Sequence, residues 1–267
     1  MTGEYDEMLA VARRAALAGG RILLAAFGRV QAREKAPGDL VTDADLDSQR
    51  AILDVLRAGF PDHTFLAEEE GVAPDPSADY RWIVDPLDGT INFAHGLPIW
   101  CVSIGLERRG ELVAGLIHEP LTGRYHAACR GLGASIDGKP THVSTSASLR
   151  TSLIACGMPV AFAADADRQL AMYGRMSTGT HSVRRTGSSA WNLAMVAAGA
   201  IDACYATGIL PWDAAAGVAL VREAGGVVTS IDGSPYDLYG PGGMLATNGH
   251  VHQEAVDRLA VPSPDGA

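Results

Sequence analysis

The chain has few cysteines, a deficit of positive charge and no long hydrophobic run. Its cysteines lie far apart, at positions 101, 129, 156 and 204, and the absence of a Cys-x-x-Cys spacing argues against a zinc site or a redox pair. Buried, reduced thiols are expected instead, and with them a cytoplasmic location. The net charge of −10 argues against a surface that binds nucleic acid.

No segment has the length and apolar character of a membrane span. The least charged long stretch, residues 186–201, is too short and contains polar side chains, so a packed helix is predicted there. Residues 1–7 are acidic where a signal peptide would be basic, so secretion is not expected. The histidines show no metal-ligand spacing, and a hydrolase that uses a phosphohistidine is therefore not indicated.

The length of 267 residues allows one large domain or two modest ones. Helical patterns over residues 5–27 and 46–60 flank a segment of turn composition, residues 34–39, that is expected to be mobile. Strand-like segments follow, and the chain then alternates strands with helices. We therefore expect an N-terminal α+β domain over residues 1–143 and a C-terminal α/β domain over residues 144–267.

The most informative pattern is Asp-Pro-Leu-Asp-Gly-Thr, which directly follows an apolar, strand-like run. The strand delivers Asp85 to its carboxyl end, and Asp88 follows across a turn that contains proline. Gly89 allows close backbone approach, and Thr90 supplies a hydroxyl where a helix can begin. Two carboxylates beside a helix start suit a divalent cation next to a phosphate. An ordinary surface turn is the alternative.

Four further motifs accompany this pattern. The run Pro-Trp-Asp-Ala-Ala-Ala-Gly places Asp213 as the N-cap of a small-residue helix, residues 214–224, that stops at a glycine pair. An acidic triplet, Glu68-Glu69-Glu70, follows an apolar segment; such charge runs are usually solvated. The other two motifs are Asp-Leu-Val-Thr-Asp-Ala-Asp at residues 39–45 and Gly-Ser-Ser-Ala-Trp-Asn-Leu at residues 187–193.

Taken in this order, the motifs resemble the inositol monophosphatase family of magnesium-dependent, lithium-sensitive phosphomonoesterases. The resemblance covers residues 10 to about 259 and implies an α/β fold, a layered αβαβα sandwich of the sugar-phosphatase type that is usually a homodimer. It implies hydrolysis of a small phosphomonoester, nominally inositol-1-phosphate, with two or three Mg²⁺ ions per site. Histidinol phosphate, fructose 1,6-bisphosphate and 3′-phosphoadenosine 5′-phosphate are alternative substrates. A regulatory binding module for the transcription machinery is the alternative from a different class.

The resemblance also assigns candidate metal ligands. They are Glu68, Asp85 and the Leu87 carbonyl for one ion, and Asp85, Asp88 and Asp213 for another. Only Asp85 would contact both ions. The third glutamate of the triplet, Glu70, leaves the register of the glutamate ligand open by one, and Glu69 is expected to assist catalysis.

Water activation is assigned by the resemblance to Thr90 together with Asp45. From the residues alone, Asp45 is also a reasonable helix-capping acid. Lys35 lies where the family approaches the substrate, although a solvated surface lysine is an equal alternative. The N–H groups around residues 187–189 would meet substrate, or would simply belong to an N-cap. The substrate contacts implied are Lys35, Asp88, Gly89, Thr90, Gly187, Ser188, Ser189 and Asp213.

One position departs from the family pattern. Inositol-selective members have a glutamate seven residues before the aspartate of the Trp-Asp motif, whereas this chain has Ala206 there. The metal-binding pattern is kept, but the side chain that would contact the polyol hydroxyls is missing. The phosphomonoesterase prediction is unaffected, and the choice of inositol monophosphate among related polyol phosphates is left open.

Overall fold

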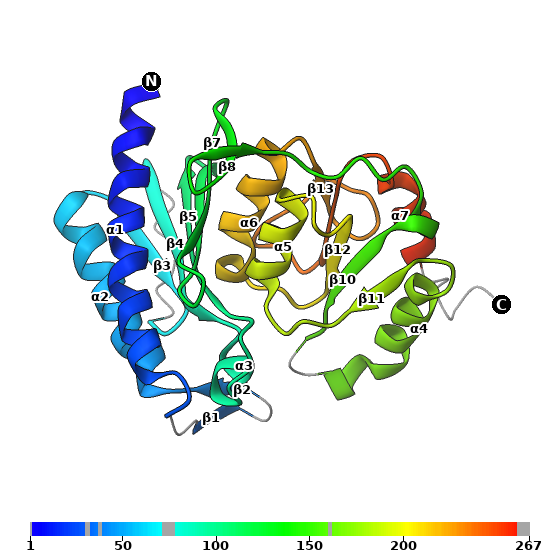
Figure 1. Cartoon of the computed structure of the whole chain (residues 1–267), viewed down its shortest axis with the longest axis horizontal. Coiled ribbons are helices and arrows are strands. Elements are labelled where there is room, and N and C mark those ends of the chain that lie inside the picture. Colours follow the sequence, from blue (N-terminus) through cyan, green and yellow to red (C-terminus); the bar gives the residue numbers. More distant parts are fainter. Residues whose placement is uncertain (1, 30–32, 37–38, 71–77, 160–161, 261–267) are drawn as a thin grey trace.

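The computed structural model describes residues 2–29, 33–36, 39–70, 78–159 and 162–260, which form five stacked layers (Figure 1). In order, the layers are α1 (Thr2–Ala26) and α2 (Asp43–Gly59), a seven-stranded sheet, α5 (Ser189–Ala197) and α6 (Pro211–Glu223), a five-stranded sheet, and α4 (Ala166–Ser177) and α7 (His252–Leu259). This arrangement confirms the predicted α/β fold class. Among the described helices, none is both long enough and apolar enough to cross a membrane.

The seven-stranded sheet is largely antiparallel. Its order is β3 (Thr64–Ala67), β4 (Tyr80–Asp88), β5 (Cys101–Arg108), β6 (Glu111–Glu119), β7 (Arg124–Cys129), β8 (Gly133–Ile136) and β9 (Lys139–Thr141). Only β3 and β4 are parallel to each other among these neighbours. A five-residue helix, α3 (Thr90–Ala94), follows β4 directly.

The five-stranded sheet has the order β11 (Ser182–Arg184), β10 (Leu153–Gly157), β12 (Ala203–Ala206), β14 (Met244–Thr247) and β13 (Val227–Thr229). Strand β10 is parallel to both β11 and β12, whereas β12, β14 and β13 are antiparallel to one another in turn. The carboxyl ends of β11, β10 and β12 therefore share one edge. Open α/β sheets usually bind their ligands at such an edge.

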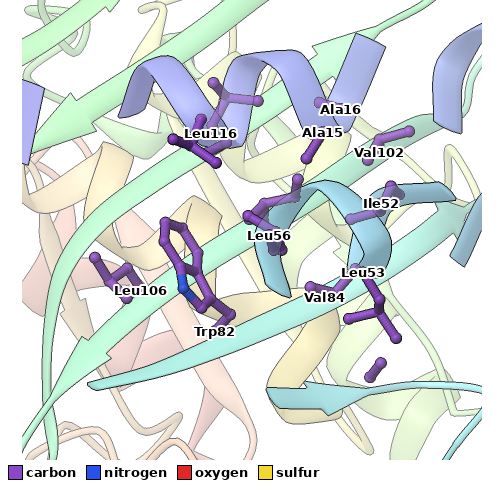
Figure 2. Packing of buried hydrophobic residues seen from close by; sticks show 14 of the residues in the cluster. Ala15, Ala16, Ile52, Leu53, Leu56, Trp82, Val84, Val102, Leu106 and Leu116 are labelled. Atoms are coloured by element: carbon purple, nitrogen blue, oxygen red, sulfur yellow. The ribbon is translucent and has the colours of Figure 1, made fainter. Parts of the chain in front are cut away.

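The main core lies between the first helical layer and the seven-stranded sheet (Figure 2). On α2, Ile52, Leu53 and Leu56 follow the spacing of one helix face and are fully buried. On β4, Trp82 and Val84 belong to this core, whereas Ile83 belongs to a cluster with Ala215 of α6 on the other side of the sheet. Because successive side chains alternate between faces, β4 is buried on both sides and its carboxyl end is held firmly.

Helix α6 approaches the seven-stranded sheet closely because both surfaces have small residues. A Cβ atom at Gly105 would lie 2.6 Å from Ala215 Cβ, and one at Gly115 would lie 2.9 Å from Ala216 Cα. The backbones of helix and sheet are thus in direct contact. This packing determines where the first turn of α6, which contains Asp213, lies relative to the end of β4.

Some elements differ from the sequence prediction. In the segment predicted as a mobile turn, residues 34–36 belong to β1 (Arg33–Ala36) and Asp39 begins β2 (Asp39–Val41); the two strands are antiparallel, and Glu34 pairs with Leu40. Helix α2 begins at Asp43 and not near residue 46, because Asp45 closes its first turn onto Thr42. Strand β14 and helix α7 are absent from the prediction.

Candidate functional site

The Asp-Pro-Leu-Asp segment is a bulge within strand β4. Asp85 pairs with Ser103 and Asp88 pairs with Cys101, so a step of three residues on β4 opposes a step of two on β5. Pro86 has no N–H to donate, which interrupts the ladder at this point. The sequence predicts a turn here, but the strand continues through the bulge and both aspartates are buried.

Three carboxylates meet at this bulge. Asp85, Asp88 and Asp213 each offer an oxygen atom, and these atoms all lie within 4.8 Å of one another. Glu68 follows β3, its N–H donating to the Val84 carbonyl at 3.2 Å, and it lines the same cavity as Asp88 and Asp213. By contrast, Glu70 is exposed and forms an ion pair with Arg57 at 3.2 Å.

The electrostatics of the cluster favour a cation. Burial, followed by the charges of Glu68, Asp88 and Asp213, raises the pKa of Asp85 well above its ordinary value. Burial and the charge of Asp88 likewise raise the pKa of Asp213 to about 8. Without a counter-charge, the buried Asp85 and Asp88 and the half-buried Asp213 repel one another and favour protonation. Oxygen ligands of this kind fit a hard divalent cation, so the donor set suits a metal centre.

Asp88 also caps helix α5. Its carboxylate accepts hydrogen bonds from the Ser188 hydroxyl and from the N–H groups of Ser189 at 3.2 Å, Ala190 at 2.7 Å and Trp191 at 3.4 Å. Burial raises the pKa of Asp88, and these hydrogen bonds oppose that shift. The N–H groups that the sequence suggests for substrate are thus directed at a carboxylate, which is the favoured charge at a helix N-terminus.

Thr90, the first residue of α3, lies between two acceptors. Its hydroxyl oxygen is 3.2 Å from Asp45 Oδ1 and 3.1 Å from the Leu87 carbonyl oxygen. The other oxygen of Asp45 accepts from the N–H of Thr42 at 2.9 Å and from its hydroxyl at 2.5 Å. Burial raises the pKa of Asp45, the hydrogen bonds from Thr42 lower it, and the charge of Glu69 adds to the increase. The helix-capping role and contact with Thr90 therefore coexist in one residue.

Two glycines hold these segments together. Gly89 has φ of 96°, and a Cβ atom there would lie 2.9 Å from the Ile99 carbonyl oxygen. Gly187 has φ of 86°, and a Cβ atom there would lie 2.9 Å from Asn92 Oδ1. Both positions need the left-handed region and have no space for a side chain. As a result, the starts of α3 and α5 lie beside each other.

Asp213 is the third residue of α6, not its N-cap as the sequence predicts. The helix begins at Pro211, because proline favours the first helical position. The N-cap is Leu210, whose N–H donates to Asp213 Oδ2 at 2.9 Å. The aspartate therefore closes the first turn while its side chain remains at the carboxylate cluster.

A cavity of about 610 Å³ opens beside the carboxylates. Glu68, Asp88 and Asp213 line it together with residues from the carboxyl ends of β10 and β12 and from the segment between β11 and α5. Ala206 and Thr207 are among these lining residues. Arg185 is the only basic side chain among the described residues that line the cavity. A volume of this size suits a small-molecule ligand.

Comparison with known proteins shows the family to which the chain belongs. The model of the inositol monophosphatase family matches residues 4–262. The chain belongs to this family. An inositol-1-monophosphatase of Synechocystis is 42% identical over 259 residues, 96% of this chain and 90% of that one. The Nus factor SuhB of Salmonella typhimurium is 36% identical, covering 91% of this chain and 92% of that one. The structure of the inositol monophosphatase from Anabaena superposes with a TM-score of 0.89 at 37% identity, covering 99% and 100% of the two chains.

The structure thus brings most of the predicted site residues of this inositol monophosphatase family member into one region. Glu68, Asp88 and Asp213 line the cavity, Asp85 lies in the same carboxylate cluster, and Thr90 with Asp45 borders the bulge. The side chain of Lys35 lies outside the described part of the chain.

Sequence reasoning missed two contributors. Asn92 donates to the carbonyls of Ile99 at 2.7 Å and Thr186 at 2.8 Å, which ties α3 to the segment before α5. Arg185 lines the cavity. The sequence offered one weak signal for Arg185, which is its position directly before Thr186 and the Gly-Ser-Ser motif. This signal does not separate Arg185 from its neighbour Arg184, which is also basic.

Proposed function

We propose that this protein is a magnesium-dependent phosphomonoesterase whose nominal substrate is inositol-1-phosphate or a related small polyol phosphate. The observation that carries the proposal is the cluster of Asp85, Asp88 and Asp213, with oxygens within 4.8 Å, beside a cavity that suits a small ligand. Membership of the inositol monophosphatase family and the name of the Synechocystis relative support the same activity.

The carboxylates would hold two or three Mg²⁺ ions. Glu68, Asp85 and the Leu87 carbonyl would hold one ion, and Asp85, Asp88 and Asp213 another. Bound magnesium would lower the pKa of a water molecule and neutralise negative charge on the phosphate. The mutual repulsion of the buried carboxylates is the feature of this site that fits such cations.

Thr90 and Asp45 would orient the attacking water. When Asp45 is ionised, the Thr90 hydroxyl donates its single proton to Asp45 Oδ1, at 3.2 Å. The lone pairs of the Thr90 oxygen then accept a hydrogen bond from water, and this holds the water's own lone pair towards the phosphorus. Glu69 would assist from beside this pair: burial and the negative charge of Glu69 raise the pKa of Asp45, whereas the hydrogen bonds from Thr42 and Thr90 favour the ionised carboxylate.

We assign the substrate contacts to Gly89 and Thr90 at the start of α3, to Gly187, Ser188 and Ser189 at the start of α5, to Asp88 and Asp213, and to Lys35. The α5 N–H groups hold Asp88, so their effect on substrate would be mainly through the placement of this carboxylate. The Ser189 side chain is half-buried at the cavity and remains a candidate for direct contact.

Phosphate release from a panel of esters tests this function. The panel contains inositol-1-phosphate, histidinol phosphate, fructose 1,6-bisphosphate and 3′-phosphoadenosine 5′-phosphate. Chelator-treated protein should be inactive and should regain activity with Mg²⁺. Asp85→Asn and Asp213→Asn should each reduce kcat by at least about a hundredfold, because the ions stabilise the charge of phosphoryl transfer. Asp257→Asn, on the exposed face of α7, is the matched control and should retain activity. Near-normal turnover by Asp85→Asn would contradict the metal assignment.

A second candidate is a binding role in the transcription machinery, favoured by the name of the Salmonella relative, Nus factor SuhB. The net charge of −10 favours a protein partner over nucleic acid. Asp213→Asn tests whether the two functions are separate: if they are, this variant should lose hydrolysis and still bind the protein partner. We further propose that lithium inhibits the protein and that it is a homodimer, in keeping with its family. We also propose a cytoplasmic location, in keeping with four cysteines that are all buried and unpaired.

A further inference from the structure

Glu119 is a buried carboxylate that lies outside the carboxylate cluster. It ends β6, and its two oxygens have different partners: Oε1 is 2.8 Å from His126 Nε2, and Oε2 accepts the indole N–H of Trp191 at 3.1 Å. Burial alone would raise the pKa of Glu119, but the hydrogen bonds with His126 and Trp191 and the nearby charge of Arg124 hold it below its ordinary value. The carboxylate is therefore ionised at neutral pH and is a strong acceptor for the indole.

Glu119 lies in the same row of the seven-stranded sheet as Asp88. Asp88 pairs with Cys101, and Val102 beside it pairs with His118, so the next residue of β6, Glu119, is level with Cys101. Asp88 and Glu119 are thus two strands apart, or roughly 10 Å at the usual strand spacing, and residues of one row point to the same face. Cys101 packs in an apolar cluster with residues of α5 and α6, so both carboxylates point towards these helices.

Trp191, in the first turn of α5, contacts both carboxylates. Its backbone N–H donates to Asp88 Oδ2 at 3.4 Å, whereas its indole N–H donates to Glu119. The N–H groups of Ser189 and Ala190 also donate to Asp88, at 3.2 and 2.7 Å. The first turn of α5 is therefore held at two points of one sheet row. Because these N–H groups belong to one helical turn, the bond to Glu119 restrains all of them, and through them the carboxylate of Asp88.

We propose that Glu119 is a positioning residue for the metal site, which fixes the first turn of α5 through Trp191 and thereby fixes the carboxylate of Asp88. Glu119 is not among the described residues that line the cavity, so it acts through Asp88 and not by contact with the substrate. Residues that orient a metal ligand in this way affect metal affinity strongly, because a ligand must lie within a fraction of an ångström of its place. The inference rests on the proposed magnesium-dependent function and adds a residue to its site.

Binding of Mn²⁺ to the protein without substrate tests the proposal. Mn²⁺ favours the same oxygen ligands as Mg²⁺, and its EPR signal reports the free ion. Dissociation constants are measured for wild type and four variants: Trp191→Phe, which keeps the charge of Glu119; Glu119→Leu; the double variant of these two; and Glu119→Gln, which keeps an acceptor for the indole. The Mg²⁺ dependence of phosphate release from inositol-1-phosphate and the free energy of unfolding in urea are measured in parallel.

Two further variants serve as references. Trp100→Phe is the matched control, since the Trp100 indole N–H is buried and has no hydrogen-bond partner among the described residues. It should lower stability, because a buried ring becomes smaller, and should leave Mn²⁺ affinity within about twofold of wild type. Asp88→Asn shows the effect of changing the ligand itself.

Trp191→Phe and Glu119→Leu should each weaken Mn²⁺ binding by about tenfold, the effect typical of losing a residue that orients a metal ligand. The double variant should bind no more weakly than either single variant, because both remove the same hydrogen bond. Glu119→Gln should bind within about twofold of wild type, since its amide oxygen can still accept from the indole. Half-maximal activity should require correspondingly more Mg²⁺, while kcat at saturating Mg²⁺ stays within about threefold.

Wild-type Mn²⁺ affinity in Trp191→Phe would overturn the inference, even if that variant were less stable. Effects that multiply in the double variant would overturn it too, because Glu119 would then not act through the indole. Absence of Mn²⁺ binding by wild type, or wild-type affinity in Asp88→Asn, would instead refute the metal assignment of the proposed function, on which the inference rests.

Discussion

At the scale of single residues, the site depends on which acceptor receives the hydroxyl proton of Thr90. Its hydroxyl has two acceptors within reach, Asp45 at 3.2 Å and the Leu87 carbonyl at 3.1 Å, but only one hydrogen to donate. If the proton points to Leu87, that carbonyl has one lone pair fewer for a metal ion. If it points to Asp45, the carbonyl is free. The charge on Asp45 therefore selects the arrangement in which both the metal ligand and the water acceptor are available.

We expect Thr90→Val to lower kcat by about a hundredfold, because the water loses its acceptor while the side-chain volume is nearly kept. Asp45→Asn should have a similar effect, since an amide can donate to Thr90 and reverse the hydrogen bond. Asp47→Asn, on the exposed side of the same helix, is the control and should behave as wild type. The measurement is kcat at saturating Mg²⁺. A Thr90→Val protein within threefold of wild type would show that Thr90 does not position the water.

The carboxylates could be singled out from the sequence because each lies in a short local pattern, and their role as metal ligands stays a prediction. Asp85 and Asp88 follow an apolar strand, and Asp213 belongs to the first turn of a helix, so their positions depend on a few neighbouring residues. Arg185 could not be singled out in this way. It faces the cavity because β11 occupies the sheet edge next to β10, and strand order is a property of the tertiary fold.

At the scale of elements, close packing of α6 on the sheet governs the site. Gly115 of β6 contacts the backbone of Ala216, one turn after Asp213. A side chain at position 115 would clash with backbone atoms of a buried helix, which cannot move aside as a flexible side chain could. Displacement of α6 would move Asp213 away from Asp85 and Asp88.

We therefore expect Gly115→Ala to lower the free energy of unfolding by about 1–3 kcal/mol and to reduce kcat/KM as well. Gly174→Ala is the matched control, because Gly174 lies in α4 with no atom within 4 Å of an added Cβ. That substitution should be neutral or stabilise the protein by about 0.5–1 kcal/mol. Urea unfolding and steady-state kinetics measure both effects. Wild-type stability in Gly115→Ala would show that α6 can shift without cost.

The elements that the sequence failed to predict have tertiary causes. The β4 bulge is read as a turn from Pro86 and Gly89, but pairing with β5 continues the strand as far as Asp88. Strand β14 lacks alternation because all four of its residues are buried between neighbouring strands and helices. A short, wholly buried segment has no periodic signal that separates it from a loop.

At the scale of the whole molecule, the site combines both halves of the chain. Asp85 and Asp88 come from the seven-stranded sheet, whereas Asp213 and the donors around Ser188 come from helices that lie between the two sheets. Because α6 also packs on the first sheet, the halves are not independent at the site. The division into domains at residues 143 and 144 stays a prediction.

The stability of the whole protein should depend on pH in a direction set by the carboxylate cluster. Burial and like charges raise the pKa of Asp213 to about 8 and that of Asp85 well above normal, so the folded, metal-free protein binds more protons than the unfolded chain. Its free energy of unfolding should therefore rise as pH falls from about 8 to 5, by up to about 1.4 kcal/mol per pH unit for each proton taken up. Saturating Mg²⁺ should raise stability at pH 8 and flatten this dependence, because bound ions replace the protons. Urea unfolding with chelator or with Mg²⁺ measures both curves, and Asp213→Asn, which lacks one of the titrating groups, should show the shallower chelator curve. If the chelated wild type instead became more stable as pH rose from 5 to 8, the carboxylates would have to be neutralised by other groups of the protein.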